Sequence, residues 1–383
     1  MSDLYKGREQ TQAKHFILRR YLQALAFKVL SAWDTLTFVD GFSGPWESRT
    51  PDFSDTSFMI AIDVLKDAQR HFRSRNQNKS IKCFFVEKKP TAFSQLDPAV
   101  RAHHDPNNRF FVETYEGEFE HAVPTIASYV QRSFALIFID PTGWTGFAFD
   151  KISTLLRHPH GEVLVNIMYD HINRFINSED IEIEKSFEQI LGGPGWKFRL
   201  DQELPRGQAL LKLFREILKN AGGYNYATTT CIEKATADRP HYFLAYGTRK
   251  PAGLEAFREV EWLALRQHED NRRQVKADRR EQRTGMSDLF AAVQSGDDSS
   301  IESLVQKNKV DVKKQVVLTM QKHRSAVRFD VLWSRVLEAH MLRVKDVKDI
   351  CVELAAEGVI ESPWRAKGNR KPHDDDLIRL CNQ

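Results

Sequence analysis

The sequence has few cysteines and no long apolar run. Its four cysteines, Cys83, Cys231, Cys351 and Cys381, lie far apart in a chain of 383 residues and form no CxxC pair. This spacing disfavours a disulfide framework and a structural zinc site, and predicts reduced thiols. No apolar stretch approaches the roughly 20 residues that span a bilayer, and the amino-terminal segment is polar. We therefore expect no membrane contact and a cytoplasmic location.

The chain also lacks a strong excess of either charge. Its formal net charge is +4, and 41% of its residues are hydrophobic while 28% are charged, which is the composition of a globular protein. Such a mild basic balance permits contact with nucleic acid without requiring it. The length favours two or three domains.

Segments typical of buried strands alternate with segments of helical periodicity. The strand-like runs cover residues 35–40, 81–88, 109–114, 134–140 and 161–168. Two β-rich segments, 224–233 and 239–250, follow across a short polar connection that suits an antiparallel hairpin. This order predicts an α/β fold: a Rossmann-like, doubly wound, mostly parallel sheet that ends in an antiparallel hairpin.

The density of charge rises sharply after residue 265. Residues 266–285 contain almost no large apolar side chain, so we interpret them as a charged, solvated helix or linker. The prediction is therefore a Rossmann-like domain over residues 1–265, the linker, and a helical region over residues 286–383.

The helical region carries the pattern of a winged helix. Helices predicted at 329–340 and 344–361 are joined by a short turn and followed by a basic loop and a strand. The cations of that loop are candidates for phosphate contacts: Arg365, Lys367, Arg370 and Lys371. The second helix bears several acids that would repel a duplex, so docking of a protein stays open beside binding of DNA or RNA.

Acidic residues end or follow the first three predicted strands. Asp40 closes the run TLTFVD and is followed by a turn that contains Gly41 and Gly44, and Glu87 closes the next strand. Ligands of open α/β sheets lie at such strand ends, where glycines let backbone amides approach and a carboxylate can accept hydrogen bonds from a ribose diol. Glu118, after the third strand, could meet an adenine amino group. These residues favour an adenosine-type ligand.

The fourth and fifth strands end in further polar groups. Asp140 and Pro141 could orient an amino group, and Trp144 could stack on a flat base, with a turn and a core tryptophan as the structural alternative. Asn166 follows in the fifth strand. Arg174 could hold a phosphate or form a structural ion pair.

Five features of the sequence occur together: DGFSGP, a strand-ending Glu87, DPTG, a VN…INR segment and PHYFLAYGTRK. In this combination the chain resembles the three-Cys-motif partner family (TcmP), which is similar to class I S-adenosylmethionine-dependent methyltransferases. The resemblance covers about residues 10–265. It implies a seven-stranded sheet and a three-Cys-motif protein as partner. It also implies S-adenosylmethionine at Asp40, Gly41, Gly44 and Glu87, and a substrate near Asp140 and Asn166.

The chain departs from methyltransferase patterns at two points. Trp46 stands where a third glycine is usual, and DPTGW differs from the DPPY of amino-methylating enzymes.

Three hypotheses about the function of the protein follow from these observations. The first is a methyltransferase acting on nucleic acid, with an exocyclic amine of a base favoured. The second is a catalytically degenerate scaffold that docks a partner through its winged helix, and the third is a metal-dependent nuclease that uses Asp140. We predict no metal site.

Overall fold

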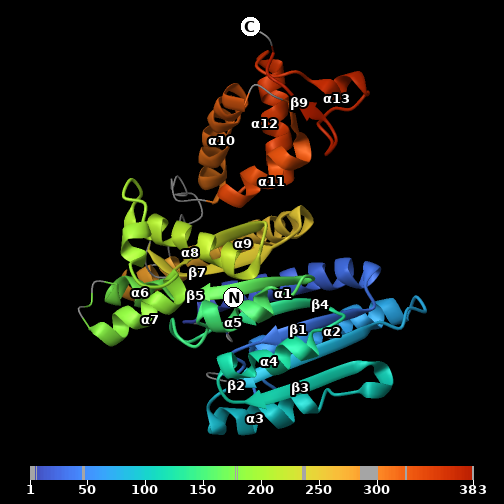
Figure 1. The fold of residues 1–383 in the computed structure, drawn as a ribbon, viewed down its shortest axis with the longest axis vertical. Coiled ribbons are helices and arrows are strands. Elements are labelled where there is room, and N and C mark those ends of the chain that lie inside the picture. Colours follow the sequence, from blue (N-terminus) through green and yellow to red (C-terminus); the bar gives the residue numbers. More distant parts are fainter. Residues whose placement is uncertain are drawn as a thin grey trace. The chain divides into compact units, whose positions relative to one another are not determined.

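The computed structural model of the protein divides into two compact units, Met1–Arg249 and Lys250–Gln383. Figure 1 shows the chain coloured from blue to red along the sequence. The structure describes residues 5, 7–44, 48–176, 178, 180–234, 239–284, 301–323 and 326–381. Among these residues no helix is both long and apolar enough to cross a membrane.

The first unit is built on one seven-stranded sheet. Its strands are β1 Thr35–Asp40, β2 Ser80–Glu87, β3 Phe110–Glu116, β4 Phe134–Ile139, β5 Gly161–Ile167, β6 Tyr226–Glu233 and β7 Pro240–Thr248. Their order across the sheet is β3-β2-β1-β4-β5-β7-β6. β1 to β5 run parallel, whereas β7 is antiparallel to both β5 and β6. This topology confirms the predicted fold class, including the terminal hairpin.

Helices follow most of the strands of this sheet, and α1 precedes the first. They are α1 Glu9–Ala32, α2 Ser57–Arg73, α3 Pro90–Arg101, α4 Phe119–Tyr129, α5 Phe149–Leu156, α6 Tyr169–Phe175, α7 Ile181–Leu191 and α8 Arg206–Gly222, with short 3-10 turns at Pro106–Asn108 and Trp196–Arg199. α1 packs beside α2, whereas α5 packs beside α4 and α8. The two groups of helices therefore bury the two faces of the sheet.

Both faces of the sheet are apolar because both are covered. On one face the ring of Phe38 lies 6.3 Å from that of Phe85 and 6.5 Å from that of Phe138, measured between centroids. On the other face Val39 belongs to a core that includes Phe119 of α4. The central strands therefore carry apolar side chains on both faces, most completely in FALIFI of β4.

The second unit is mostly helical. Its elements are α9 Pro251–Thr284, α10 Ile301–His323, β8 Val327–Arg328, α11 Phe329–Ala339, α12 Val344–Ala356, α13 Pro363–Ala366 and β9 Leu377–Ile378. β8 pairs with β9 in an antiparallel manner, and Ile360 forms an isolated bridge with Leu380. The helix predicted at 344–361 ends at Ala356, and the short helix α13 lies where a loop was expected, so the winged helix stays a prediction.

The division between the units differs from the predicted one. It falls at Arg249, before the predicted boundary at 265, and the charged residues, expected to form a solvated helix or a linker, continue the helix α9 up to Thr284. The physical reason lies at the start of α9, where Leu254 and Phe257 are fully buried and the helix packs against α11 of its own unit. The run of charged residues therefore belongs to the second half of a helix and is not a break in the chain.

Candidate functional site

The carboxyl ends of the central strands form the candidate site. Chain order reverses between β1 and β4, since β2 and β3 lie on one side of β1 while β4 and β5 lie on the other. Ligands of open α/β sheets bind at such a switch point. Asp40 is in register with Phe85 of β2 and Phe138 of β4, and Glu87 and Asp140 come just after these partners. The structure therefore brings the three predicted acids to one edge.

Asp40 holds the turn after β1 together. Its side chain is fully buried, with one oxygen accepting from the Phe42 amide at 3.0 Å and the other from the Ser57 hydroxyl at 2.7 Å. Burial raises the pKa of Asp40 to about 7, although both hydrogen bonds act to lower it. Because both oxygens have partners inside the protein, Asp40 stabilises the conformation of the glycine turn.

The turn leaves no room for a side chain at Gly41. A Cβ there would lie 2.8 Å from the ring of Phe119, and the Gly41 amide donates to the Phe138 carbonyl at 2.9 Å. Close approach of backbone and ring is therefore the reason for this glycine. Gly44 ends the described part of the turn, while Trp46 lies outside the described residues, so its predicted crowding of the site stays a prediction.

Glu87 offers an unused acceptor at the end of β2. The residue is 1% exposed, and its Oε1 accepts from the Lys89 amide at 2.7 Å. Its Oε2 is buried and has no hydrogen-bond partner among the described residues. Burial raises the pKa of Glu87, because the charged form is poorly solvated there. A buried carboxylate oxygen without a partner is costly, so this atom is suited to a ligand that donates a hydrogen bond.

Asp140 and Asn166 form a pair beside that edge. The Asn166 amide nitrogen donates to Asp140 Oδ1 at 2.7 Å, and Lys14 Nζ lies 2.5 Å from Asp140 Oδ2. Asn166 is 2% exposed, and its own Oδ1 has no partner among the described residues. The neighbouring Pro141 is buried. The structure therefore joins two predicted residues and adds Lys14, which the sequence interpretation missed.

Trp144 packs mainly against apolar side chains. Its indole stacks on Phe187 with ring centroids 5.2 Å apart, and it lies 5.4 Å from the ring of Phe175. The indole nitrogen donates to the Ser186 hydroxyl at 2.8 Å. These contacts are those of a core tryptophan, which was the structural alternative to stacking on a base. None of these contacts of Trp144 supports stacking on a base.

Two other predicted residues lie on the surface. Glu118 stands directly before α4, and its exposed side chain makes no capping hydrogen bond and lies 3.9 Å from the His121 ring nitrogen. Arg174 is exposed on α6, where its guanidinium lies 6.0 Å from the Phe175 ring centroid. Neither makes a contact with the acids at the strand ends that the structure records.

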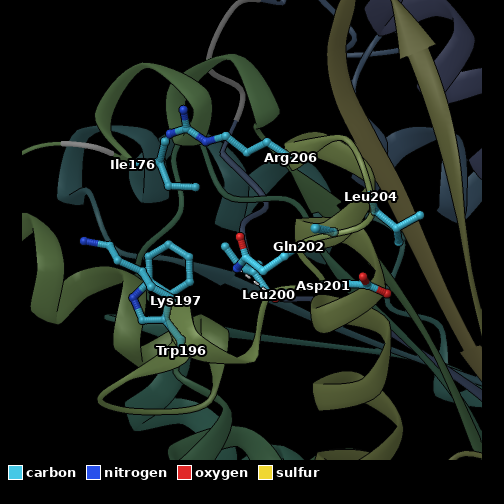
Figure 2. A pocket seen from close by; sticks show the side chains of 9 residues that line it. Ile176, Trp196, Lys197, Leu200, Asp201, Gln202, Leu204 and Arg206 are labelled. Carbon is cyan, nitrogen blue, oxygen red and sulfur yellow. Dashed lines mark hydrogen bonds between the residues drawn. The ribbon is translucent and has the colours of Figure 1, made fainter.

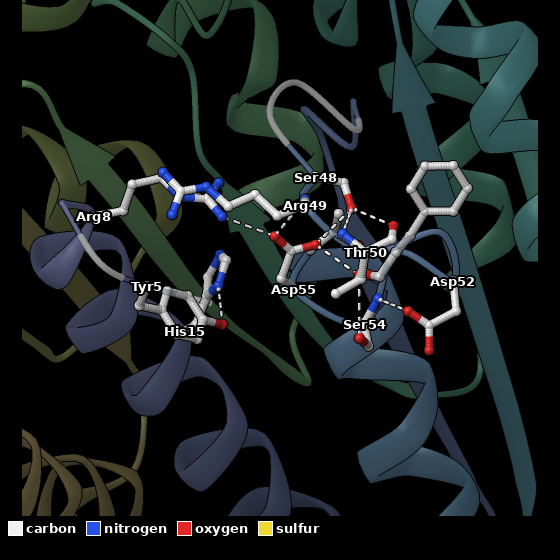
Figure 3. A network of polar contacts seen from close by, with 11 residues as sticks. Tyr5, Arg8, His15, Ser48, Arg49, Thr50, Asp52, Ser54 and Asp55 are labelled. Atoms are coloured by element: carbon white, nitrogen blue, oxygen red, sulfur yellow. Dashed lines mark hydrogen bonds and ion pairs between the residues drawn. The ribbon is translucent and has the colours of Figure 1, made fainter. Parts of the chain in front are cut away.

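The segment before α1 is held against the loop that precedes α2 (Figure 3). Arg8 pairs with Asp55 at 2.9 Å, and Asp55 also accepts from the Ser48 hydroxyl at 2.6 Å and the Arg49 amide at 2.9 Å. Burial acts to raise the pKa of Asp55, but these hydrogen bonds outweigh it and lower the pKa to about 2. The charged Asp55 thus anchors the chain ahead of Lys14.

His15 is a buried and uncharged part of the same region. Its Nδ1 lies 3.0 Å from the Tyr5 hydroxyl, as Figure 3 shows. Burial, followed by the positive charge of Lys14, lowers the pKa of His15 to about 3. The imidazole is therefore neutral at physiological pH, and Lys14 is the charged side chain that the start of α1 directs to the site.

A pocket of about 320 Å³ lies elsewhere in the first unit. Its walls include Ile176, Trp196 and Arg206, which surround it in Figure 2. Another hollow, lined by Lys82 and Tyr129 among others, has about 610 Å³. None of the predicted site residues lines either one, so these pockets do not coincide with the strand-end acids.

Two of the four predicted cations in the loop before β9 form ion pairs within their own unit. Lys367 lies 3.2 Å from Asp375 and 2.7 Å from Asp376, and Lys371 lies 2.6 Å from Asp349 of α12. The structure thus pairs these cations with acids, including one acid of the helix predicted to repel a duplex.

The other two cations, Arg365 and Arg370, are exposed. No ion pair of either guanidinium occurs among the residues that the structure describes. Arg365 in α13 and Arg370 in the loop before β9 are therefore the two cations of the predicted four without an ion pair among the described residues.

The described part of the chain contains no cluster of three or more His, Cys, Asp or Glu side chains suited to hold a metal ion.

The comparisons with known proteins are sparse. No family model matches the sequence, and no curated protein matches it. A proposed O-methyltransferase from Klebsiella pneumoniae is similar in structure, with 12% identity, a TM-score of 0.32 and coverage of 60% of this chain and 80% of that one.

A DUF519 protein from Legionella pneumophila str. Philadelphia 1 is also similar, with 12% identity, a TM-score of 0.33 and coverage of 65% of this chain and 87% of its own. At such TM-scores the likeness carries no argument about function. The α/β fold class therefore rests on the sheet topology above, and the resemblance to the three-Cys-motif partner family stays a prediction.

Proposed function

We propose that the protein is an S-adenosylmethionine-dependent methyltransferase that acts on an exocyclic amine of a nucleobase in DNA or RNA. The observation that carries this proposal is Glu87, whose buried Oε2 has no partner among the described residues and lies at the sheet edge where a ribose is bound in folds of this type. The second support is the Asp140–Asn166 pair at the same edge.

The residues present fit such a cofactor at its sugar. A vicinal diol has two O–H donors, and Glu87 has an acceptor that no described residue satisfies. In the turn after β1, Gly44 is the small residue beside which a ligand could meet backbone, because the Phe119 ring fills the space at Gly41. When bound, the cofactor would supply a methyl group whose bond to sulfur breaks as a bond to the acceptor nitrogen forms, while that nitrogen releases a proton to water.

The protein's own residues would act by positioning. Asp40 keeps the turn in place through Phe42 and Ser57, and thereby sets the cofactor-facing backbone. Asp140, whose two oxygens already accept from Asn166 and Lys14, would act together with the Pro141 carbonyl to position the amine of the acceptor base. The base must leave its stack to reach this edge, which favours single-stranded or flipped substrates.

For the second unit we propose a winged helix, formed by β8, α11, α12 and the loop before β9. Arg365 and Arg370 support contact with nucleic acid because they are exposed cations. The family resemblance adds a three-Cys-motif protein as a proposed partner.

A scaffold that docks a protein through this unit is the second candidate. The observation that favours it is the pairing of Lys367 and Lys371 with acids, which leaves less charge for phosphates. Binding of S-adenosylmethionine distinguishes the two candidates, because a scaffold needs no cofactor.

The test compares Glu87→Gln with Glu116→Gln. These residues are in register on neighbouring strands, but Glu116 is exposed, which makes it a matched control. Calorimetry with S-adenosylmethionine should show binding by the wild type and by Glu116→Gln. Glu87→Gln should bind about 10- to 100-fold more weakly, since hydrogen bonds to charged groups contribute about 1.5–3 kcal/mol.

Transfer of radiolabelled methyl groups to DNA and RNA should follow the same order. Absence of S-adenosylmethionine binding by the wild-type protein would reject the methyltransferase and favour the scaffold. Equal binding by the two variants would remove Glu87 from the cofactor site.

A further inference from the structure

Three side chains from separate parts of the first unit form one connected chain at the sheet edge. Lys14 of α1 pairs with Asp140 after β4 at 2.5 Å, and Asp140 accepts from Asn166 of β5 at 2.7 Å. The side chains of Lys14 and Asp140 are only 15% and 13% exposed. Such a shielded ion pair is screened less by solvent than a surface pair and has a defined geometry.

This chain determines which way the Asn166 amide faces. A carboxylate can only accept hydrogen bonds, so the amide nitrogen must face Asp140 and the amide oxygen must face elsewhere. Lys14 occupies the second carboxylate oxygen and keeps Asp140 from turning toward another donor. The orientation of Asn166 therefore depends on a lysine with which it shares no contact that the structure records.

The amide oxygen of Asn166 is left without a donor. Asn166 is 2% exposed, and its Oδ1 is buried with no partner among the described residues. An unsatisfied buried acceptor is costly, and a ligand with an N–H or O–H donor would remove that cost. Asn166 lies one residue before the carboxyl end of β5, and its amide nitrogen contacts Asp140 at the candidate site.

The start of α1 is held firmly enough to aim Lys14. The Tyr242 hydroxyl of β7 donates to the Gln10 carbonyl, and Arg8 pairs with the buried Asp55 at 2.9 Å. These contacts come from two separate elements, one from β7 and one from the loop before α2. Lys14 therefore reaches Asp140 from a helix start that is held at two places.

We infer that Lys14 is a positioning residue that orients the Asn166 amide through Asp140, so that Asn166 Oδ1 accepts a hydrogen bond from the amino group of the acceptor base. This inference rests on the proposed function and deepens it, because it names the group on the substrate that the site recognises. Bases that bear an exocyclic amine, such as adenine and cytosine, are preferred over bases that lack one, such as hypoxanthine and uracil.

The test uses Lys14→Met, which keeps length and removes charge, and Lys14→Arg, which keeps charge. Lys28→Met is the matched control, because Lys28 is exposed on the same helix. Thermal unfolding and S-adenosylmethionine calorimetry come first. Both Lys14 variants should remain folded and bind the cofactor within about threefold of the wild type, since the Lys14 chain is separate from Glu87.

The first readout is binding without cofactor. Fluorescence anisotropy compares single-stranded oligoadenylate and oligocytidylate with oligoinosinate and oligouridylate. The wild type and Lys28→Met should prefer the amine-bearing strands by about three- to tenfold, the value of one neutral hydrogen bond. Lys14→Met should lose this preference, and Lys14→Arg should retain most of it.

The second readout is methyl transfer to the same strands. Lys14→Met should lower kcat by about 10- to 100-fold, within the range of a lost orienting contact, while KM for the cofactor stays near the wild-type value. An unchanged kcat and base preference in Lys14→Met would overturn the inference, as would a wild type that methylates oligoinosinate as well as oligoadenylate.

The failures are distinguishable. A Lys14→Met variant that loses cofactor affinity in proportion to its rate would assign the Asn166 oxygen to the cofactor and overturn the inference, while the methyltransferase proposal stands. A wild type that neither binds S-adenosylmethionine nor transfers methyl groups would overturn both.

Discussion

The polar side chains of the two units differ in their burial and in whether they have partners. At the sheet edge of the first unit, Glu87 and Asn166 are buried and each retains an acceptor oxygen without a partner among the described residues. In the loop before β9 of the second unit, Lys367 and Lys371 are exposed and each forms an ion pair nearby.

This difference separates a candidate ligand site from a charged surface. A buried acceptor without a donor is costly, so its presence indicates a missing partner, whereas an exposed ion pair contributes little and indicates none. Charge alone would have pointed to the second unit. Burial and hydrogen-bond satisfaction point to the first.

The largest expected effect is a pH-dependent gain in stability from Asp40→Asn. Burial raises the pKa of Asp40 from 3.8 to about 7, so between these values the unfolded chain loses its proton first and stability falls as pH rises. Below pH 3.8 both states are protonated and the effect vanishes. Denaturation by urea should show a variant more stable than wild type by up to about 4 kcal/mol near pH 8, and by little near pH 4.

A second substitution sharpens this result. The Ser57 hydroxyl donates to Asp40 and acts to lower its pKa, so Ser57→Ala should extend the fall in wild-type stability to higher pH. The difference in the free energy of unfolding between Asp40→Asn and wild type should change between about pH 4 and about pH 8. A constant difference would show that the buried turn behaves like exposed polar surface, and would contradict the distinction between the two units.

The next effect is steric and concerns the packing beneath the same turn. Gly41→Ala places a Cβ 2.8 Å from the buried ring of Phe119, and we expect a loss of about 1–3 kcal/mol in the free energy of unfolding. Gly143→Ala is the matched control, since a Cβ at that residue would have no neighbour within 4 Å among the described residues, and it should change stability by less than about 0.5 kcal/mol. Equal losses would contradict a tightly packed turn.

The smallest effect lies in the second unit. Replacing Arg365 and Arg370 together by Ala should weaken binding to single-stranded nucleic acid and reduce the slope of log affinity against log salt by about 1.4, at roughly 0.7 per phosphate contact. Replacing Lys367 and Lys371 should change that slope less, because both are already paired.

Anisotropy titrations at several salt concentrations provide the measurement. Equal slopes for the two double variants would show that the ion pairs open on binding. Absence of any binding by the wild-type protein would favour the protein-docking interpretation of this unit.

Much of the first unit could be predicted from local patterns. The apolar runs that end in Asp40 and Glu87 identified two parallel strands, because a sheet covered on both faces leaves no other pattern. The boundary at Arg249 could not be predicted, since it depends on Leu254 and Phe257 packing in a helix that contacts α11, an element far away in the chain. The rise in charge density placed the predicted boundary at 265, in the middle of α9.

The candidate site shows the same limit. Asp140 and Asn166 were expected near each other because parallel strands bring their carboxyl ends to one edge. Lys14 was not expected, since one lysine in an amphipathic helix has no sequence signal for the strand end it meets. For Trp144 the sequence left two alternatives, stacking on a base or packing in the core. Its stacking on Phe187 depends on where α7 packs.

The amino-acid sequence by itself determined the alternation of strands and helices, the acids at the strand ends and the glycine turn, because each depends on neighbours within a few residues. Only the tertiary structure decided which of these acids keeps an oxygen for a ligand. That property depends on burial and on every donor within reach, and those donors come from distant segments: the Ser57 hydroxyl for Asp40, and the ammonium of Lys14 for Asp140.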